Sequence, residues 1–239
     1  MRLAVMQPYF YPYLGYFQLI HHADLFVVYD TVQYMKGGWI NRNRILLDGT
    51  ERFVTVPVVR GSLADRIQEK QIDRRDGKWV SRILGQVSAA YRNASCYASV
   101  FPSLREALCV EEMGLSRYVR HQMEWACQRL GIDTEFVFAS ELVPECLGGS
   151  AVARLLAMCR RVGATEYVNA IGGRKLYSRE DFASEGVELS FLVTCCPQYR
   201  QAGDAFFPDL SVIDTMMNCS GSEIVDMLPC YEILRADSR

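Results

Sequence analysis

The sequence contains little of what metal, membrane and secreted proteins need. It has 3 histidines, and none of its 9 cysteines forms a CxxC pair, so a zinc site has no local support. No apolar run approaches the roughly 20 residues that span a bilayer. Leu3–Met6 follows the first two residues directly and lacks a cleavable signal pattern. We therefore expect a cytoplasmic protein with no metal and no membrane contact.

An excess of charge of one sign is also missing. The 26 basic and 28 acidic residues are spread along the chain and leave a formal charge of −2. Without a basic stripe, general nucleic-acid binding is disfavoured. Several cysteines, such as Cys127 and Cys159, lie in apolar helical stripes, which favours reduced thiols that pack as small hydrophobic groups.

The chain has enough apolar material for one large core. Its 239 residues are 50% hydrophobic, and no internal repeat or low-complexity linker divides them. We therefore expect a single domain, residues 1–239, with a helical segment around residues 78–131. Apolar residues at helical spacing predict helices over 78–108 and 115–130, and Gly131 ends the second.

The first thirty residues predict a strand, a loop, a helix and a second strand. Leu3–Met6 is apolar and ends before a proline, helical spacing fills residues 14–23, and residues 25–29 are β-rich. Such a unit favours an α/β fold with a parallel sheet, which binds ligands at the carboxyl ends of its strands. Gln7 and Asp30 would lie there.

The rest of the chain predicts a hairpin followed by α/β alternation. Asp48-Gly49 is a strong turn signal, and residues 52–58 would form the returning strand. Hydrophobic periodicity then predicts strands near 135–139, 166–169 and 187–193, and helices near 150–162, 211–217 and 222–228.

Aromatic residues crowd the loop that follows the first predicted strand. Tyr9, Tyr13 and Tyr16 could form the wall of a binding site, Gly15 would let a ligand approach the backbone, and Gln7 supplies a donor and an acceptor. Because such a cluster is unusual at a mere connection, we interpret it as a substrate-binding loop. The alternative is that these tyrosines only pack the first helix onto the sheet.

Residues 33–45 concentrate cations, amides and aromatics around two glycines. Arg42 and Arg44 would point to one side of an extended chain, and guanidinium groups clamp phosphates or carboxylates. The alternative is a solvated strand whose charges protect a sheet edge. From this segment we assign substrate binding to Gln33, Trp39, Asn41, Arg42, Asn43 and Arg44.

A pair of glycines follows the strand predicted near residue 169. Paired glycines let backbone amides face an anion, and neighbouring cations add charge. The segment lacks the spacing of the common nucleotide fingerprints, and a structural turn is the alternative. We assign anion or nucleotide binding to Asn169, Gly172, Gly173, Arg174, Lys175 and Tyr177.

Few groups are suited to moving protons. As catalytic candidates we take Gln7, Asp30 and Lys36, whereas Asp214 fits a buried structural acid better than a base. A nucleophile at Cys195-Cys196 would have no base nearby in the sequence.

Several segments together resemble the WbqC-like family, over residues 3 to 229. They are QPYFYPYLGYFQLI, AD-x-FV-x-YD-x-VQY-x-K-x-x-W-x-NRNRI, LGI-x-T-x-F-x-x-x-SEL, GATEYVNAIGGRKLY and FFPDLSVIDTMMN. The resemblance implies a setting in clusters for O-antigen and other surface polysaccharides, and a glycine-transferase role has been suggested for one member. The chain departs from the pattern at Asn169-Ala170, Asn218-Cys219-Ser220 and Gly148-Gly149-Ser150, and these changes bear on substrate choice.

The order of elements at the start is also similar to nucleotidyltransferases and pantothenate-synthetase-like ligases. This resemblance implies a three-layer parallel sheet of the HUP/nucleotidyltransferase-like type, with an inserted or appended helical lobe. Those enzymes carry an HxGH-type signature, of which Tyr13-Leu14-Gly15-Tyr16 keeps the glycine and lacks both histidines. Nucleotide chemistry therefore does not follow from the fold.

Two functions are expected. The first is a transferase or ATP-dependent amide ligase that moves an acyl or aminoacyl group, such as glycyl, to a small amine or amino sugar in surface-polysaccharide or other specialised biosynthesis. The use of ATP or another nucleotide is left open, as is a homo-oligomer. The second is a non-catalytic protein of a biosynthetic cluster that holds a small molecule or a partner with the same aromatic loop.

Overall fold

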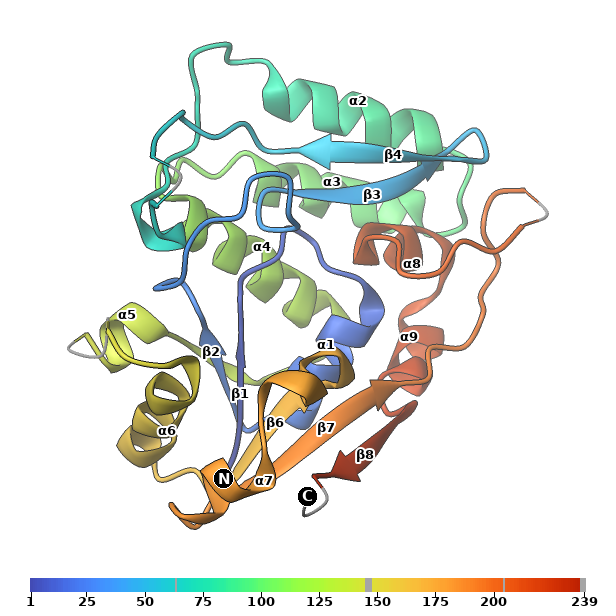
Figure 1. The fold of residues 1–239 in the computed structure, drawn as a ribbon. Coiled ribbons are helices and arrows are strands. Elements are labelled where there is room, and N and C mark those ends of the chain that lie inside the picture. Colours follow the sequence, from blue (N-terminus) through green and yellow to red (C-terminus); the bar gives the residue numbers. More distant parts are fainter. Residues whose placement is uncertain (63, 145–147, 204, 237–239) are drawn as a thin grey trace.

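A six-stranded, mostly parallel sheet forms the centre of the computed structural model (Figure 1), which describes residues 1–62, 64–144, 148–203 and 205–236. The strand order is β5-β2-β1-β6-β7-β8, and the neighbours from β5 to β7 run parallel, whereas β8 pairs antiparallel with β7. The predicted α/β class is thereby confirmed. The strands are β1 (Arg2–Met6), β2 (Leu25–Val28), β5 (Glu135–Phe138), β6 (Glu166–Ala170), β7 (Glu188–Thr194) and β8 (Tyr231–Arg235).

Alternate residues of the central strand contribute to two different cores. Ala4 packs in the core that includes helix α1 (Leu14–His22), whereas Leu3 and Val5 pack in the core that includes α6 (Ala151–Val162). Successive side chains of a strand point to opposite faces, so a strand covered on both sides is apolar throughout. The short helices α5 (Ala139–Leu142) and α7 (Arg179–Ala183) contribute to the same core as α6.

A large insertion between β2 and β5 forms a helical lobe above the carboxyl ends of the parallel strands (Figure 1). Its apolar side chains belong to the same core as α1, so the lobe and one face of the sheet share one hydrophobic interior. The lobe contains β3 (Arg42–Leu47), β4 (Thr50–Thr55), the 3-10 helix η1 (Ile67–Glu69), α2 (Trp79–Tyr91), α3 (Tyr97–Leu108) and α4 (Leu115–Leu130).

Local sequence signals located most of these elements. The β3–β4 hairpin turns at Asp48 and Gly49, whose φ angles of 50° and 68° are both positive, as a tight hairpin turn requires. Gly131 ends α4 with a φ of 71°. The prediction of one helix over 78–108 is wrong, because two separate helices form: the first ends at Tyr91 and the second begins at Tyr97.

Two further features complete the chain. Between β7 and β8 lie α8 (Val212–Asn218) and α9 (Gly221–Met227), while the 3-10 helix η2 (Ile171–Leu176) follows β6. The antiparallel strand β8 was not predicted, and β4 ends before the residue 58 that was expected. Among the helices of the described ranges, none has the length and apolar character needed to cross a membrane.

Candidate functional site

The strand order places two of the predicted loops together at one end of the sheet. β1 lies between β2 and β6, so the direction in which the chain builds the sheet reverses beside β1. In open α/β sheets, ligands bind in the crevice at such a reversal, beyond the carboxyl ends of the strands. The aromatic loop (residues 7–13, after β1) and the η2 segment (residues 169–177) flank this point.

The aromatic loop is held in a strained conformation. Tyr11 has a φ of 42°, which is rare for a bulky residue and typically costs about 1–3 kcal/mol. The surroundings fix it: the Tyr11 carbonyl oxygen accepts hydrogen bonds from Asn43 Nδ2 (2.9 Å) and Ser211 Oγ (2.8 Å), and its hydroxyl donates to Gln122 Oε1. Phe10 and Tyr11 are consequently buried, whereas Tyr9 and Tyr13 keep partial exposure.

Three segments distant in sequence meet around a cavity of about 240 Å³, which we call the aromatic cavity. Backbone hydrogen bonds join them: Phe10 N–H donates to the Trp39 carbonyl oxygen (3.0 Å), and Ser211 N–H donates to that of Arg44 (2.9 Å). The cavity is lined by Tyr9, Tyr13, Trp39, Asn43, Arg44 and Asp209. The structure therefore brings together five residues that the sequence assigned to substrate binding.

Opposite charges face this cavity. Arg44 pairs with Glu51 (2.8 Å), lies 5.2 Å from the centre of the Trp39 ring, and keeps its buried Nε without a hydrogen-bond partner in the described ranges. Asp209 is exposed, has a φ of 56°, and its carboxylate has no hydrogen bond or ion pair within the described part of the chain. One cation and one free carboxylate thus stand among three aromatic rings.

Tyr13 is neutral at physiological pH. Burial, assisted by the nearby Asp209 carboxylate, raises the pKa of Tyr13 to about 12, and burial also raises the pKa of Tyr9. Both hydroxyls therefore act as hydrogen-bond donors or acceptors and not as bases. Partial burial, assisted by the nearby Asp209 carboxylate, raises the pKa of Cys196 to about 11, although part of the residue is exposed, so little thiolate forms at neutral pH.

Gly15 has no side chain, and this leaves room for the Tyr13 ring in the wall of the cavity. A Cβ atom at Gly15 would lie 2.5 Å from Tyr13 Cε2 and 2.5 Å from Thr194 Cγ2. Any larger residue would displace the Tyr13 ring or the end of β7. Gly15 therefore shapes the cavity and does not line it.

Asp30, a catalytic candidate, is engaged in a structural role. It is 2% exposed, and its two oxygens accept from the N–H (3.0 Å) and the hydroxyl (2.7 Å) of Ser140, at the start of α5. Burial raises the pKa of Asp30, while the Ser140 hydrogen bonds oppose this rise. The carboxylate joins the ends of β2 and β5.

The other predicted residues near this end of the sheet divide into two groups. Gln7 is half-buried and its carbonyl oxygen accepts from the buried Tyr16 hydroxyl (2.6 Å), so Tyr16 supports the loop from beneath. Gln33 is exposed and bridges to Arg66 through the backbone. Among the described lining residues of the aromatic cavity, none of these three occurs. Lys36, Asn41 and Arg42 line a separate groove on the inserted lobe.

The η2 segment is compact at its start and exposed at its tip. Asn169 is buried and its Oδ1 accepts from the Ala170 N–H (2.8 Å), and a Cβ at Gly173 would lie 2.6 Å from Asn169 Nδ2. Tyr177 packs edge-on against Tyr167, with ring centres 5.9 Å apart. The remaining members, Gly172, Arg174 and Lys175, are exposed. The assignment of this segment to anion binding stays a prediction.

Metal ligands do not gather in the described ranges, where no group of three or more His, Cys, Asp or Glu side chains could hold an ion.

Asp214 is fully buried, as the sequence suggested, and accepts hydrogen bonds from Tyr91 Oη (2.8 Å), Tyr199 Oη (2.8 Å) and Gln201 Nε2 (3.1 Å). Of the cysteines, Cys146 lies outside the described residues.

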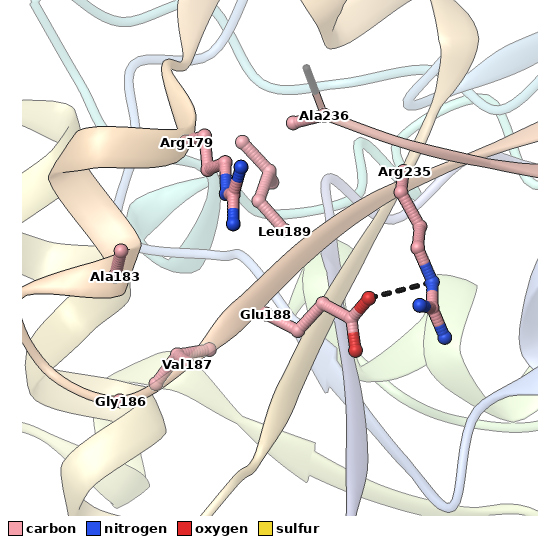
Figure 2. Close-up of a pocket in the computed structure, with 8 residues that line it drawn as sticks. All are labelled: Arg179, Ala183, Gly186, Val187, Glu188, Leu189, Arg235 and Ala236. Atoms are coloured by element: carbon pink, nitrogen blue, oxygen red, sulfur yellow. Dashed lines mark ion pairs between the residues drawn. The ribbon is translucent and has the colours of Figure 1, made fainter. Parts of the chain in front are cut away.

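A second cavity, of about 540 Å³, lies at the opposite end of the sheet. Figure 2 shows the side chains that line it. It is built where β7 begins and β8 ends, and the Glu188–Arg235 ion pair (2.7 Å) crosses it. Because it faces away from the carboxyl ends of the parallel strands, we do not take it as the main site. Its lining comprises Arg179, Ala183, Gly186, Val187, Glu188, Leu189, Arg235 and Ala236.

Sequence reasoning missed Asp209 and Ser211. Both lie in the FFPDLSVIDTMMN segment, which was used for its family resemblance, for a predicted helix over 211–217 and for Asp214, but not as a source of site residues. A Pro-Asp pair just before a predicted helix was the available signal, and it reads equally well as an ordinary turn.

Comparison of the sequence with known proteins identifies its family. Residues 7–226 match the WbqC-like protein family. The chain is 31% identical over 234 residues to a protein of Mycobacterium tuberculosis (strain ATCC 25618 / H37Rv) named "Uncharacterized protein Rv1507c", covering 95% of this chain and 97% of that protein. No solved structure matches.

Proposed function

The chain belongs to the WbqC-like protein family, and on that premise we propose that it is a transferase or amide-forming ligase that joins an acyl or aminoacyl group to a small amine. The aromatic cavity would hold the amine. Surface-polysaccharide or other specialised biosynthesis is the proposed setting, with a glycyl group as one candidate for the transferred unit.

The observation that carries this proposal is the composition of the aromatic cavity. An ammonium group is attracted both to a free carboxylate, here Asp209, and to the faces of aromatic rings, here Tyr9, Tyr13 and Trp39. Arg44 and Asn43 supply donors and acceptors for hydroxyl or carboxylate groups on the same molecule. At about 240 Å³, the cavity suits a small solute.

The chemistry proposed is direct attack by the amine. The bound ammonium first releases one proton to solvent, which frees the lone pair of its nitrogen. The nitrogen then forms a bond to the acyl carbon while the bond from that carbon to its leaving group breaks, and a second proton leaves the nitrogen. The leaving group departs with the electron pair, and the Asp209 carboxylate, which lines the cavity, receives the second proton. Because the pKa of Cys196 is raised to about 11, a covalent thioester on this residue is disfavoured.

We further propose the HUP/nucleotidyltransferase-like type for the fold and a single domain for residues 1–239. The strand order around β1 and the hydrophobic core shared by the sheet and the inserted lobe support both proposals.

Binding of amines tests the cavity directly. Calorimetric titration should detect glycine or glucosamine, whereas N-acetylglucosamine, which lacks the amine, should bind at least ten times more weakly. Asp209→Asn should weaken amine binding about tenfold or more, because it removes a charge-assisted contact. Asp133→Asn, at an exposed aspartate away from the cavity, is the matched control.

Turnover decides between an enzyme and a binding protein. The protein would be incubated with these amines and with acyl thioesters, or with carboxylic acids and ATP, and products followed by mass spectrometry. An amide product that disappears in Asp209→Asn supports the proposal. Amine binding at the cavity without any amide product would leave only a binding role.

A further inference from the structure

A second site-like feature lies on the inserted lobe, beside the aromatic cavity. It is a groove of about 830 Å³ between the turn that precedes β3 and the chain that follows β4, and we call it the basic groove. Four cations contribute to its lining, whereas its described lining includes no aspartate or glutamate. They are Lys36, Arg42, Arg60 and Lys70. In a chain with a formal charge of −2, this is a local concentration of positive charge.

Two of these cations are fixed in position. Lys70 is 5% exposed, pairs with Asp65 (2.7 Å), and lies 5.4 Å from the centre of the Tyr34 ring. Arg42 donates to the carbonyl oxygens of Gly37 and Gly38, and its guanidinium lies 4.3 Å from the centre of the exposed Phe53 ring. The Arg42 charge is therefore held at the groove before any ligand arrives, whereas the Lys70 charge is compensated by Asp65.

The other two cations are available to a ligand. Lys36 and Arg60 are exposed, and within the described ranges neither has a hydrogen bond or an ion pair. The framework between them is rigid, since Tyr34 Oη donates to Asn41 Oδ1 (2.9 Å) and Asn41 Nδ2 donates to the Val56 carbonyl oxygen (2.7 Å). Arg42, which has no ion pair among the described residues, and the two exposed cations, on a wall of mixed polar and apolar residues, match the requirements of a multiply charged anion.

From these contacts we infer that the basic groove binds the phosphate groups of a small organic di- or triphosphate. Lys36 and Arg60 make ion pairs with the phosphate oxygens, while Arg42 adds a fixed positive charge beside them. This inference places phosphate recognition on the inserted lobe and not at the η2 segment.

The basic groove and the aromatic cavity are lined by residues that lie two positions apart on the same strand, β3. Arg42 lines the groove and Arg44 lines the cavity, and both side chains leave β3 on the same face, about 7 Å apart. One molecule of nucleotide size could therefore hold its phosphates in the groove and its acyl group at the cavity. This identification of the phosphorylated ligand as the acyl donor rests on the proposed function. In this donor the acyl carbon is bonded to an oxygen of the terminal phosphate. The amine nitrogen forms its bond to that carbon, and the phosphate leaves with the electron pair of the broken carbon–oxygen bond.

Direct binding measurements on the full chain test the inference. Isothermal titration with ATP, ADP, pyrophosphate and adenosine should show binding of the three phosphorylated compounds and none of adenosine. Affinity should fall as the salt concentration rises, because exposed ion pairs carry the contact. Absence of binding by all three phosphorylated compounds would overturn the inference.

Variants locate the site. Lys36→Gln and Arg60→Gln should each weaken ADP binding by about fivefold or more, and the circular dichroism spectrum should be unchanged because both side chains are exposed. The matched control is Arg161→Gln, at an exposed cation on α6, which should leave ADP binding unchanged. If Lys175→Gln abolishes binding and the two groove variants do not, phosphate binds at η2 and the inference is wrong. ADP binding at the groove without any amide product would overturn the proposed function alone.

Discussion

Asp214 illustrates how one buried side chain connects the lobe to the segment that follows β7. Its carboxylate is fully buried and accepts hydrogen bonds from Tyr91 on α2 and from Tyr199 and Gln201, and no cation contacts it among the described residues. Burial raises its pKa above the ordinary value, although the hydrogen bonds oppose this. A carboxylate of this kind is costly when charged and nearly without cost when protonated.

We expect the stability cost of Asp214→Asn to shrink as the pH rises from about 4 to 7. The folded pKa is raised, so the contribution of Asp214 to wild-type stability is full below the unfolded pKa and is lost as the pH passes the folded pKa. The amide does not titrate, so the variant lacks this loss. Urea unfolding should give a cost of about 1–3 kcal/mol at the acid end and less at neutral pH.

The difference between wild type and variant isolates this one group, because other titrating residues contribute equally to both. Asp133→Asn, at an exposed position, is the control and should change the free energy of unfolding only slightly. A cost for Asp214→Asn that stays constant or grows with pH would contradict the assignment.

At the residue scale, the sequence indicated several side chains of the site, but it did not indicate their partners from distant parts of the chain. Tyr9, Tyr13 and Arg44 come from segments whose composition is itself unusual, and the structure places them around one cavity. Asp209 joins them only through the tertiary fold, since a single aspartate after a proline carries no signal of its partners. Asp30 was predicted at the correct end of the sheet, yet its contact with Ser140 could not be read from either residue alone.

At the element scale, Asp30 and Ser140 hold neighbouring parallel strands in register. Val28 pairs with Phe138, and Asp30 and Ser140 each lie two residues beyond that pair. The contact therefore joins the ends of β2 and β5, and it also satisfies a backbone donor at the start of the four-residue helix α5. A helix this short depends on such contacts, because isolated short helices are marginal in water.

A double-mutant cycle should measure this link. Asp30→Ala and Ser140→Ala should each destabilise the protein by about 1–3 kcal/mol, and their effects should be non-additive by about 0.5–3 kcal/mol. The measurement is the free energy of unfolding in urea for the wild type, both single variants and the double variant. The exposed pair Ser178 and Asp181, which also shares side-chain hydrogen bonds, is the control and should couple more weakly. Fully additive effects at Asp30 and Ser140 would show that the two groups act independently.

Elements with strong local signals were predictable, and those that depend on partners were not. The hairpin follows from Asp48-Gly49, and the end of α4 follows from Gly131. The break between α2 and α3 is marked by no proline or glycine, and it is stabilised by contacts such as Cys96 N–H to the Met217 carbonyl oxygen (3.0 Å). The strand β8 forms because β7 offers an edge, which is information that its own sequence does not hold.

At the scale of the whole molecule, the inserted lobe is continuous with the sheet. One core contains Phe26 and Val168 from the sheet together with Trp79 and Met123 from the lobe. A separate domain would have its own core and few contacts across a linker. The shared interior therefore predicts that the lobe and the sheet unfold in one cooperative step.

Two probes can follow the two parts independently. The three tryptophans, Trp39, Trp79 and Trp125, all lie in the insertion between β2 and β5, so their fluorescence follows the lobe. Hydrogen exchange of the amides in β1 and β6 follows the sheet. With rising urea, both probes should report the same midpoint and the same free energy of unfolding.

Core substitutions sharpen this prediction, since the two faces of the sheet have different cores. Met123→Ala in the shared core and Met158→Ala on the buried face of α6 should each cost about 2–5 kcal/mol, and each should lower both midpoints together. If Met123→Ala shifted the fluorescence transition and left the exchange of β1 unchanged, the lobe would be a separate folding unit. The aromatic cavity would then lie between two independently stable bodies, and its shape would depend on how they dock. A single transition instead implies that the strained Tyr11 backbone and the cavity walls are held by the stability of the entire chain.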